Sequence, residues 1–284
     1  ILCQMTSVDL LKLVDPSLYY ERFIEGGMFP DGRAIDAFKP FSFKRGVVGG
    51  VVAGSALVRQ GGVTVVCSLT ASLAPLSTEP SMVVEFDGTP DENEAKMALM
   101  DARTLLEDLI ARDAFVARRA LTSTDDRLEW RLQATFKLLH SDGDLAAAVV
   151  GSLLAALTDA RLPPVLLQHA ADDEAPIEPS EIKIEKEESK WAHIELSSFP
   201  VASTFMLHVD EEGQMHLLAD PPVDARQLCK SHCTIVIGKK KENSSLSILA
   251  LRSAGSCCDD LLRRMVGIAE KRQETIVKAL EKKD

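Results

Sequence analysis

The stretch DPSLYYERFIEGGMFPDGR, residues 15–33, predicts a short amphipathic helix, a glycine stop and a tight turn. Pro16 suits the first helical position, because the N–H that proline lacks would have no partner there. Tyr20, Phe23 and Ile24 share one helix face at spacings of three and four. Either of the two following glycines can take the left-handed conformation that ends a helix, and Pro-Asp-Gly fits a turn. These preferences leave the arginine after the turn unexplained.

A Tyr-Tyr-x-x-Phe helix that leads into Pro-Asp-Gly-Arg resembles the N-terminus of the RNase PH-like subunits of the RNA exosome. The resemblance is strongest to subunits of the ribosomal RNA-processing protein 43 type, and it extends over about residues 16–284. Members of that family usually carry an arginine before this element, where the present chain has Phe29. The resemblance implies an α/β (α+β) chain with the RNase PH-like fold, in which two βαβα-type halves pack mixed sheets against helices.

The resemblance and one shift in composition together predict four parts of the chain. We expect an N-terminal helical extension over residues 1–29 and a first RNase PH-like half over residues 30–170. Glu, Lys, Pro and Ser dominate residues 171–190, which predicts a solvated acidic connection with a short edge strand at 182–184. The second half, which ends in a long helix, then occupies residues 191–284.

Strands are predicted wherever apolar residues alternate or β-branched residues cluster. In the first half, a strand is expected near residues 38–45, and runs at 50–59 and 63–70 read as a hairpin that helices cover in part. The clearest strand is 127–138, because its apolar and polar residues alternate strictly. The second half is predicted to hold strands near 202–209, 214–218, 233–237 and 246–251.

Three further helices are expected from capping signals and apolar periodicity. Thr89, Pro90 and Glu92 form a capping box that starts a helix ending near Arg112. The residues predicted to be buried on that helix are Met97, Met100, Leu106 and Leu109 or Ile110. The other two helices are predicted at about 145–159 and from about residue 256 to the end of the chain. The apolar stripe of the last one comprises Leu261, Met265, Ile268, Ile276 and Leu280.

Composition excludes several classes of protein. A chain of 284 residues that is 46% hydrophobic has enough apolar side chains for a sizeable core. No apolar run approaches the roughly 18 residues that a membrane span needs, and we expect neither a membrane partner nor a signal peptide. A net charge of −11 argues against tight RNA binding by the lone chain, because RNA affinity depends on Lys and Arg. Six cysteines in a chain of this size predict reduced thiols in the cytosol or nucleus.

The candidate site is the segment Asp142-Gly143-Asp144-Leu145-Ala146, where a strand is expected to lead into a helix N-terminus. Such a junction offers free N–H groups and a positive dipole to an anion. Active RNase PH-like enzymes, which this chain resembles, have the motif Asp-Gly-Gly-Thr-Arg-Thr or a close variant at this junction. In those enzymes the motif surrounds inorganic phosphate. In this chain Asp144 replaces the second glycine, and Leu145 and Ala146 replace the hydroxyl residue and the arginine. We expect Asp144 to cap the helix itself, which leaves a degenerate phosphate site.

Two other departures agree with this expectation. Active relatives carry an arginine-rich loop after the third strand that holds RNA, whereas residues 74–82 of this chain contain no basic residue. Active relatives also place acidic residues on a strand of the second half. The best placement of those positions is Arg226 and His232, and Asp224 is the only acid from 221 to 237. Little is therefore left for acid–base chemistry.

The remaining polar motifs have weaker functional interpretations. Lys44 and Arg45, together with Arg118 and Arg119, are candidate RNA contacts if they face a channel with basic neighbours. The Lys239-Lys240-Lys241 run is expected to be a solvated hairpin tip. Cys229, His232 and Cys233 lack the second ligand pair that a closed zinc site needs, so no metal and no cofactor is expected.

The resemblance implies a non-catalytic member of a six-subunit ring of related chains. It further implies cap subunits with S1 or KH domains, RNA threaded through the centre toward a separate 3′–5′ exoribonuclease, and a location in nucleus, nucleolus and cytoplasm. Three alternatives remain: a ring subunit of the 42 or 45 type, an active phosphorolytic 3′–5′ exoribonuclease, and a free-standing RNA-binding module. The residues after Gly143 argue against the second, and the net charge argues against the third.

Overall fold

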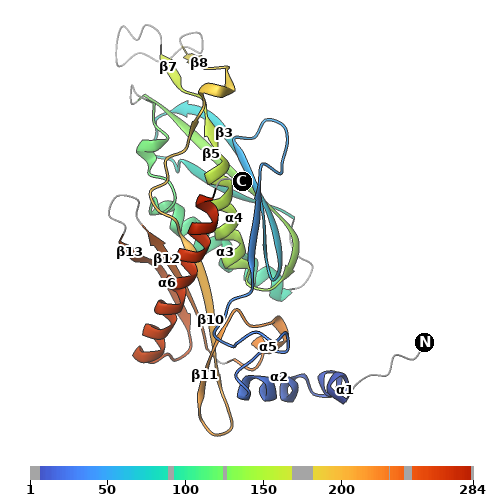
Figure 1. Ribbon diagram of the computed structural model, residues 1–284. Helices are drawn as coiled ribbons and strands as arrows, with labels where there is room; N and C mark the ends of the chain where they lie inside the picture. Colours follow the sequence, from blue (N-terminus) through green and yellow to red (C-terminus); the bar gives the residue numbers. More distant parts are fainter. Residues whose placement is uncertain are drawn as a thin grey trace, which may run out of the picture.

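The computed structural model describes residues 7–88, 93–123, 127–167, 182–229, 231–239 and 245–282. It contains one sheet from each half of the chain, with helices packed against both (Figure 1). Helix α4 (Leu145–Asp159) contacts strands of both sheets. The C-terminal helix α6 (Asp259–Glu281) contributes Ile276 and Leu280 to the core cluster that surrounds α4. The predicted arrangement of sheets packed against helices is confirmed.

The first sheet has five strands in the order β1-β2-β3-β5-β4. Its strands are β1 (Phe41–Arg45), β2 (Gly54–Gln60), β3 (Gly62–Pro75), β4 (Met82–Asp87) and β5 (Leu128–Asp142). Only β4 and β5 are parallel, so the sheet is mixed. The predicted hairpin and the alternating strand are confirmed, although β2 begins four residues later than expected and β5 runs to Asp142. Strand β4 was not predicted.

The second sheet has four antiparallel strands in the order β11-β10-β12-β13. They are β10 (Val201–Val209), β11 (Met215–Ala219), β12 (Ser231–Lys239) and β13 (Leu246–Ala254). All four predicted strands of this half are confirmed, with their ends moved by at most three residues. Cross-strand pairing accounts for the extra residues, because ladder partners extend β12 and β13 beyond their most apolar stretch.

Short elements connect the two sheets. Strand β6 (Arg161–Leu162) pairs with β9 (Ala192–His193), and β7 (Val165–Leu167) pairs with β8 (Ile182–Ile184). The second pair confirms the edge strand expected at 182–184. The 3-10 helix η3 (Glu188–Lys190) also lies in this connection, whereas the 3-10 helix η1 (Arg118–Ala120) precedes β5 in the first half and the short α5 (Val223–Arg226) lies between β11 and β12.

The N-terminal helices form as the opening stretch indicates. Helix α1 (Ser7–Val14) precedes α2 (Pro16–Glu25), whose first turn is capped by the N–H of Leu18 donating to the Asp15 carboxylate at 3.0 Å. Gly27 takes the left-handed conformation at φ 75°, so the second of the two glycines ends the turn. Tyr20 and Ile24 are buried, and the Tyr20 hydroxyl donates to Asp224 Oδ2 at 3.1 Å. This contact attaches the helical extension to α5.

One predicted packing face is confirmed only in part: Leu106 and Leu109 are buried as predicted, whereas Met97 and Met100 are not. On α3 (Asn93–Ala111), Met97 and Met100 are each 69% exposed. The buried face consists of Leu99, Ala102, Leu105, Leu106 and Leu109. The helix is apolar on two sides, and only one of them meets α4 and β4, so periodicity alone did not select the buried face. The capping box at 89–92 lies outside the described residues.

Helix α4 is buried along nearly its whole length because it is apolar all round. Strand β2 approaches its C-terminal end closely at Gly54. A Cβ atom at Gly54 would lie 2.6 Å from the Cα of Ala160 and 2.7 Å from the carbonyl oxygen of Ala156. Glycine is therefore required at this position by backbone contact. Among the described residues, no helix has both the length and the apolar character that crossing a membrane requires.

Candidate functional site

The junction between β5 and α4 is closed by the chain's own aspartate. The N–H of Ala147 donates to Asp144 Oδ1 at 3.3 Å, which confirms the expected helix cap. Leu145 is buried in the core, and Ala146 is half-buried. Neither side chain offers the hydroxyl or guanidinium group that would surround a phosphate.

Buried polar side chains from both halves gather beside Asp144. We call Lys39, Gln60, Asp144, Asp220 and Arg272 the junction cluster. The Gln60 amide donates to Asp220 Oδ2 at 3.5 Å, and the Arg272 guanidinium lies 3.9 Å from the centre of the Phe38 ring. Asp144, Asp220, Gln60 and Arg272 are each more than nine-tenths buried. A buried charge needs opposite charge nearby, so the cationic and acidic members of the cluster depend on one another.

The electrostatics of the cluster follow from that burial. Burial and the nearby Asp144 charge raise the pKa of Asp220, against the opposing effect of Lys39, Arg272 and Arg33. Burial also lowers the pKa of Arg272, while Asp220 and Asp144 raise it. The positive charge of Arg272 thus already interacts with the carboxyl groups of Asp144 and Asp220. An anion entering the junction would have to compete with Asp144 for the same positive charge.

Arg33, which local preferences left unexplained, holds the backbone beside the junction cluster. Its guanidinium donates to the carbonyl oxygens of Ala219 at 2.8 Å and Asp220 at 2.9 Å. Asp220 has φ 47°, a left-handed conformation that is uncommon for a residue other than glycine. Phe29 is fully buried, and the Arg33 guanidinium lies 4.2 Å from its ring centre. The Pro-Asp-Gly-Arg turn of the first half therefore fixes Asp220 of the second half.

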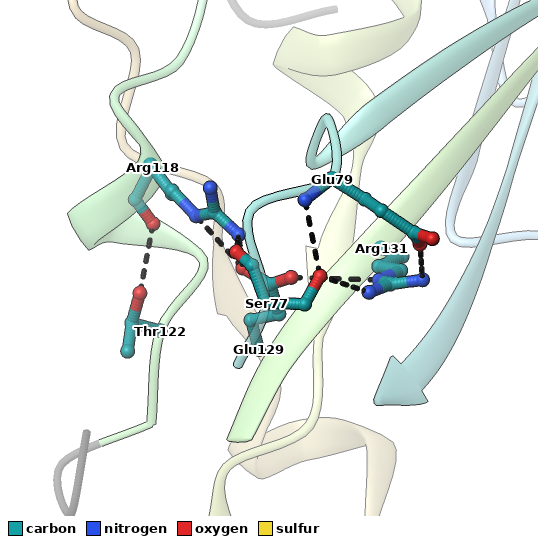
Figure 2. A network of polar contacts seen from close by, with 6 residues as sticks. All are labelled: Ser77, Glu79, Arg118, Thr122, Glu129 and Arg131. Atoms are coloured by element: carbon teal, nitrogen blue, oxygen red, sulfur yellow. Dashed lines mark hydrogen bonds and ion pairs between the residues drawn. The ribbon is translucent and has the colours of Figure 1, made fainter. Parts of the chain in front are cut away.

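A second set of polar contacts surrounds the loop that follows β3. Arg118 of η1 and Arg131 of β5 both reach this loop, which has no basic residue of its own (Figure 2). Arg118 donates to Glu129 Oε2 from Nε at 2.9 Å and from Nη2 at 2.7 Å, and also to the carbonyl oxygen of Ser77. Arg131 donates to Glu79 at 2.5 Å and to the Ser77 hydroxyl at 2.6 Å. Each arginine therefore already has a carboxylate partner.

The other predicted RNA-contact residues are dispersed over the first half. Lys44 is exposed on β1, whereas the neighbouring Arg45 turns toward α6, donates to the carbonyl oxygen of Leu280 and lies 5.2 Å from the Phe43 ring centre. Lys44 is in register with Leu57, Val66 and then Lys137 across the sheet.

The partner of Arg118 is Glu129, eight residues from Lys137 on β5, or about 26 Å along the strand. Arg119 is exposed and lines a cleft of about 750 Å³ with Arg112 and Ser197. The structure therefore does not gather Lys44, Arg45, Arg118 and Arg119 into one patch.

The positions considered for acid or metal chemistry in the second half do not converge. Arg226 ends α5, and His232 is exposed on β12 while the adjacent Cys233 is buried on its opposite face. Cys229 donates weakly to the carbonyl oxygen of Ala225, and burial raises its pKa to about 12. Within the ranges that the structure describes, no group of three or more His, Cys, Asp or Glu side chains is placed to hold a metal ion.

Sequence reasoning missed most members of both sites. Lys39, Gln60 and Arg272 have no motif, and the signal for Arg272 was only its position on an otherwise apolar stripe of α6. Glu129 and Arg131 belong to the polar face of the alternating strand predicted at 127–138, and no motif distinguishes them from its other polar residues. Glu129 is instead fully buried by its contact with Arg118.

Known proteins share this architecture. Residues 37–163 match the 3′ exoribonuclease family, domain 1. A chain of an Archaeoglobus fulgidus exosome with RNA bound to the active site superposes with a TM-score of 0.67 at 18% identity, covering 95% of this chain and 99% of that one. The chain has an RNase PH-like fold. An archaeal exosome core chain gives a TM-score of 0.66 at 19% identity, covering 95% of this chain and 97% of its own length. Rice (Oryza sativa) Rrp46 gives 0.56 at 16% identity, covering 88% and 96%.

Proposed function

We propose that this chain is a non-catalytic structural subunit of an RNA exosome ring, of the ribosomal RNA-processing protein 43 type. The observation that carries the proposal is Asp144, whose buried carboxylate caps α4 at the place where active relatives hold phosphate. The exosome chains with the same fold support the assembly part of the proposal, because they cover nearly the full length of this chain. The subunit acts through its shape, as one segment of a ring around an RNA path.

In this proposal the partners are the other RNase PH-like ring subunits, cap subunits with S1 or KH domains, and an associated 3′–5′ exoribonuclease that degrades the threaded RNA. The process is 3′-to-5′ RNA processing and decay in nucleus, nucleolus and cytoplasm. Ring subunits of the 42 or 45 type would have other neighbours and the same chemistry.

The junction cluster argues against an active phosphorolytic enzyme. Phosphorolysis needs inorganic phosphate as the attacking nucleophile, held beside the RNA 3′ end by preorganised donors. Here the donor at Ala147 is occupied by Asp144, and Arg272 already interacts electrostatically with both Asp144 and Asp220. A phosphate entering this junction would also be repelled by those carboxylates.

Two measurements test the proposal on the full chain. The tagged chain, expressed in cells and recovered under mild conditions, is expected to copurify with related ring subunits in equal amounts, as measured by mass spectrometry. The purified chain is expected to release no nucleoside diphosphates from RNA at any phosphate concentration. Recovery as a stable monomer without related chains would refute ring membership, and phosphate-dependent release of nucleoside diphosphates would refute the non-catalytic assignment.

A further inference from the structure

The two carboxylates that bind Arg118 and Arg131 differ sharply in burial. Glu129 is fully buried between the two arginines, whereas the Glu79 side chain is 67% exposed (Figure 2). Removing one partner of a buried ion pair leaves an uncompensated charge, so Glu129 is a fixed part of the fold. An exposed ion pair contributes little to stability, so Glu79 can leave Arg131 at small cost.

The contacts of Arg131 show which of its hydrogen-bond donors would become free if Glu79 moved away. Its three guanidinium nitrogens are directed at three groups: Nη1 at Glu79 Oε2 (2.5 Å), Nη2 at Ser77 Oγ (2.6 Å) and Nε at Glu129 Oε1 (3.4 Å). The Arg131 side chain is 28% exposed, so solvent reaches it. Without Glu79, Nη1 of Arg131 loses its carboxylate partner, while the Ser77 hydroxyl stays within hydrogen-bond distance of the same guanidinium group.

We propose that Arg131 and Ser77 form a binding site for a backbone phosphate of single-stranded RNA, and that Glu79 is the internal anion which the phosphate displaces. The inference deepens the proposed function, since it places an RNA contact on this subunit. A guanidinium fork and a hydroxyl together supply the donors that phosphate oxygens accept. The four charges of Arg118, Arg131, Glu79 and Glu129 cancel, so displacement of Glu79 exposes one net positive charge only when an anion arrives.

The test uses the full chain alone and a fluorescently labelled oligouridine, with binding measured by anisotropy over a series of salt concentrations. Glu79→Gln removes the internal anion. Glu85→Gln is the matched control: it removes the same charge from β4, where Glu85 accepts a hydrogen bond from Gln133 on the same sheet. Each variant is also made together with Arg131→Gln, and circular dichroism verifies that all of them are folded.

Glu79→Gln is expected to bind about three- to tenfold more tightly than the unsubstituted chain at low salt. The slope of log affinity against log salt should steepen by about 0.7, the value for one additional phosphate contact on a single strand. Glu85→Gln should change neither quantity by a comparable amount, and Arg131→Gln should abolish the gain from Glu79→Gln.

Three results would overturn the inference: equal gains from Glu79→Gln and Glu85→Gln, a gain that survives Arg131→Gln, or no detectable binding by Glu79→Gln. An oligoglutamate peptide that competes as strongly as unlabelled oligouridine would also overturn it, by assigning the site to acidic peptides. Because the measurement needs no other subunit, its result is separate from that of the copurification test. A chain that assembles but fails this test keeps the proposed function and loses only the RNA contact.

Discussion

At the scale of single residues, Asp220 is the most strained group in the molecule's candidate site. It combines a left-handed backbone, almost complete burial and a raised pKa, and Arg33 fixes the backbone on which it sits. A strained backbone conformation persists only where the surrounding structure holds it in place, and such conformations are concentrated at functional sites. In this chain the left-handed conformation of Asp220 persists although Asp144 caps α4 at the junction between β5 and α4.

The raised pKa of Asp220 predicts a pH dependence of stability. Because the folded chain keeps the proton of Asp220 above the ordinary aspartate pKa of about 3.9, stability falls as pH rises through the window between that value and the raised pKa. Asp220→Asn is expected to remove this slope, since asparagine tolerates the left-handed conformation and does not titrate. Urea unfolding at several pH values measures the effect.

Asp210 provides the control for that prediction because its pKa is shifted in the opposite direction. The hydrogen bond from His216 at 2.8 Å lowers the pKa of Asp210, so its contribution is present above the ordinary pKa and lost as pH falls. Asp210→Asn should therefore remove a loss of stability at acid pH. An unchanged pH profile in Asp220→Asn would contradict the assignment of the slope to Asp220.

At the scale of elements, the sequence predicted strands and helices better than it predicted which faces are buried. Strict alternation in 127–138 and four short strands of the second half were sufficient, because each has a clear period or β-branched composition. Strand β4 was missed, since its six residues directly follow a proline-rich loop. The buried face of α3 was predicted correctly at Leu106 and Leu109 but not at its two methionines, because only tertiary contact selects between two apolar sides. The helix cap at Asp144 is local and was predicted, whereas the other members of the junction cluster meet only in three dimensions.

The close contact between β2 and α4 yields a prediction about these two elements. Gly54→Ala places a Cβ 2.6 Å from the Cα of Ala160, an atom that cannot rotate away, so it is expected to lower the free energy of unfolding by about 2–3 kcal/mol. Gly267→Ala is the matched control, because Gly267 lies inside α6 with no heavy atom within 4 Å of the added methyl. There alanine should stabilise the protein by up to about 1 kcal/mol. Chemical denaturation distinguishes the two, and equal effects would contradict the packing described.

At the scale of the whole molecule, the largest hydrophobic cluster contains residues of both halves. The cluster around α4 includes Val201, Ala202 and Val236 from the second sheet and Ile276 and Leu280 from α6. The sequence divided the chain at 190/191, and that division remains a prediction. A cluster that contains residues of both halves favours one cooperative unfolding unit over two independent domains, although β10, β11, β12 and α6 also bury a second cluster within the second half.

Ile276→Ala tests that coupling. Ile276 is 5% exposed and lies on α6 in the cluster that joins the two halves, so truncation is expected to cost about 2–4 kcal/mol. If the halves unfold together, native-state hydrogen exchange should show equal losses of protection for the slowest amides of β3 and β12. Val209→Ala, at a 44% exposed position on β10, should leave both sets nearly unchanged. A loss confined to β12 would mean that the first half folds independently and that α6 only covers its surface.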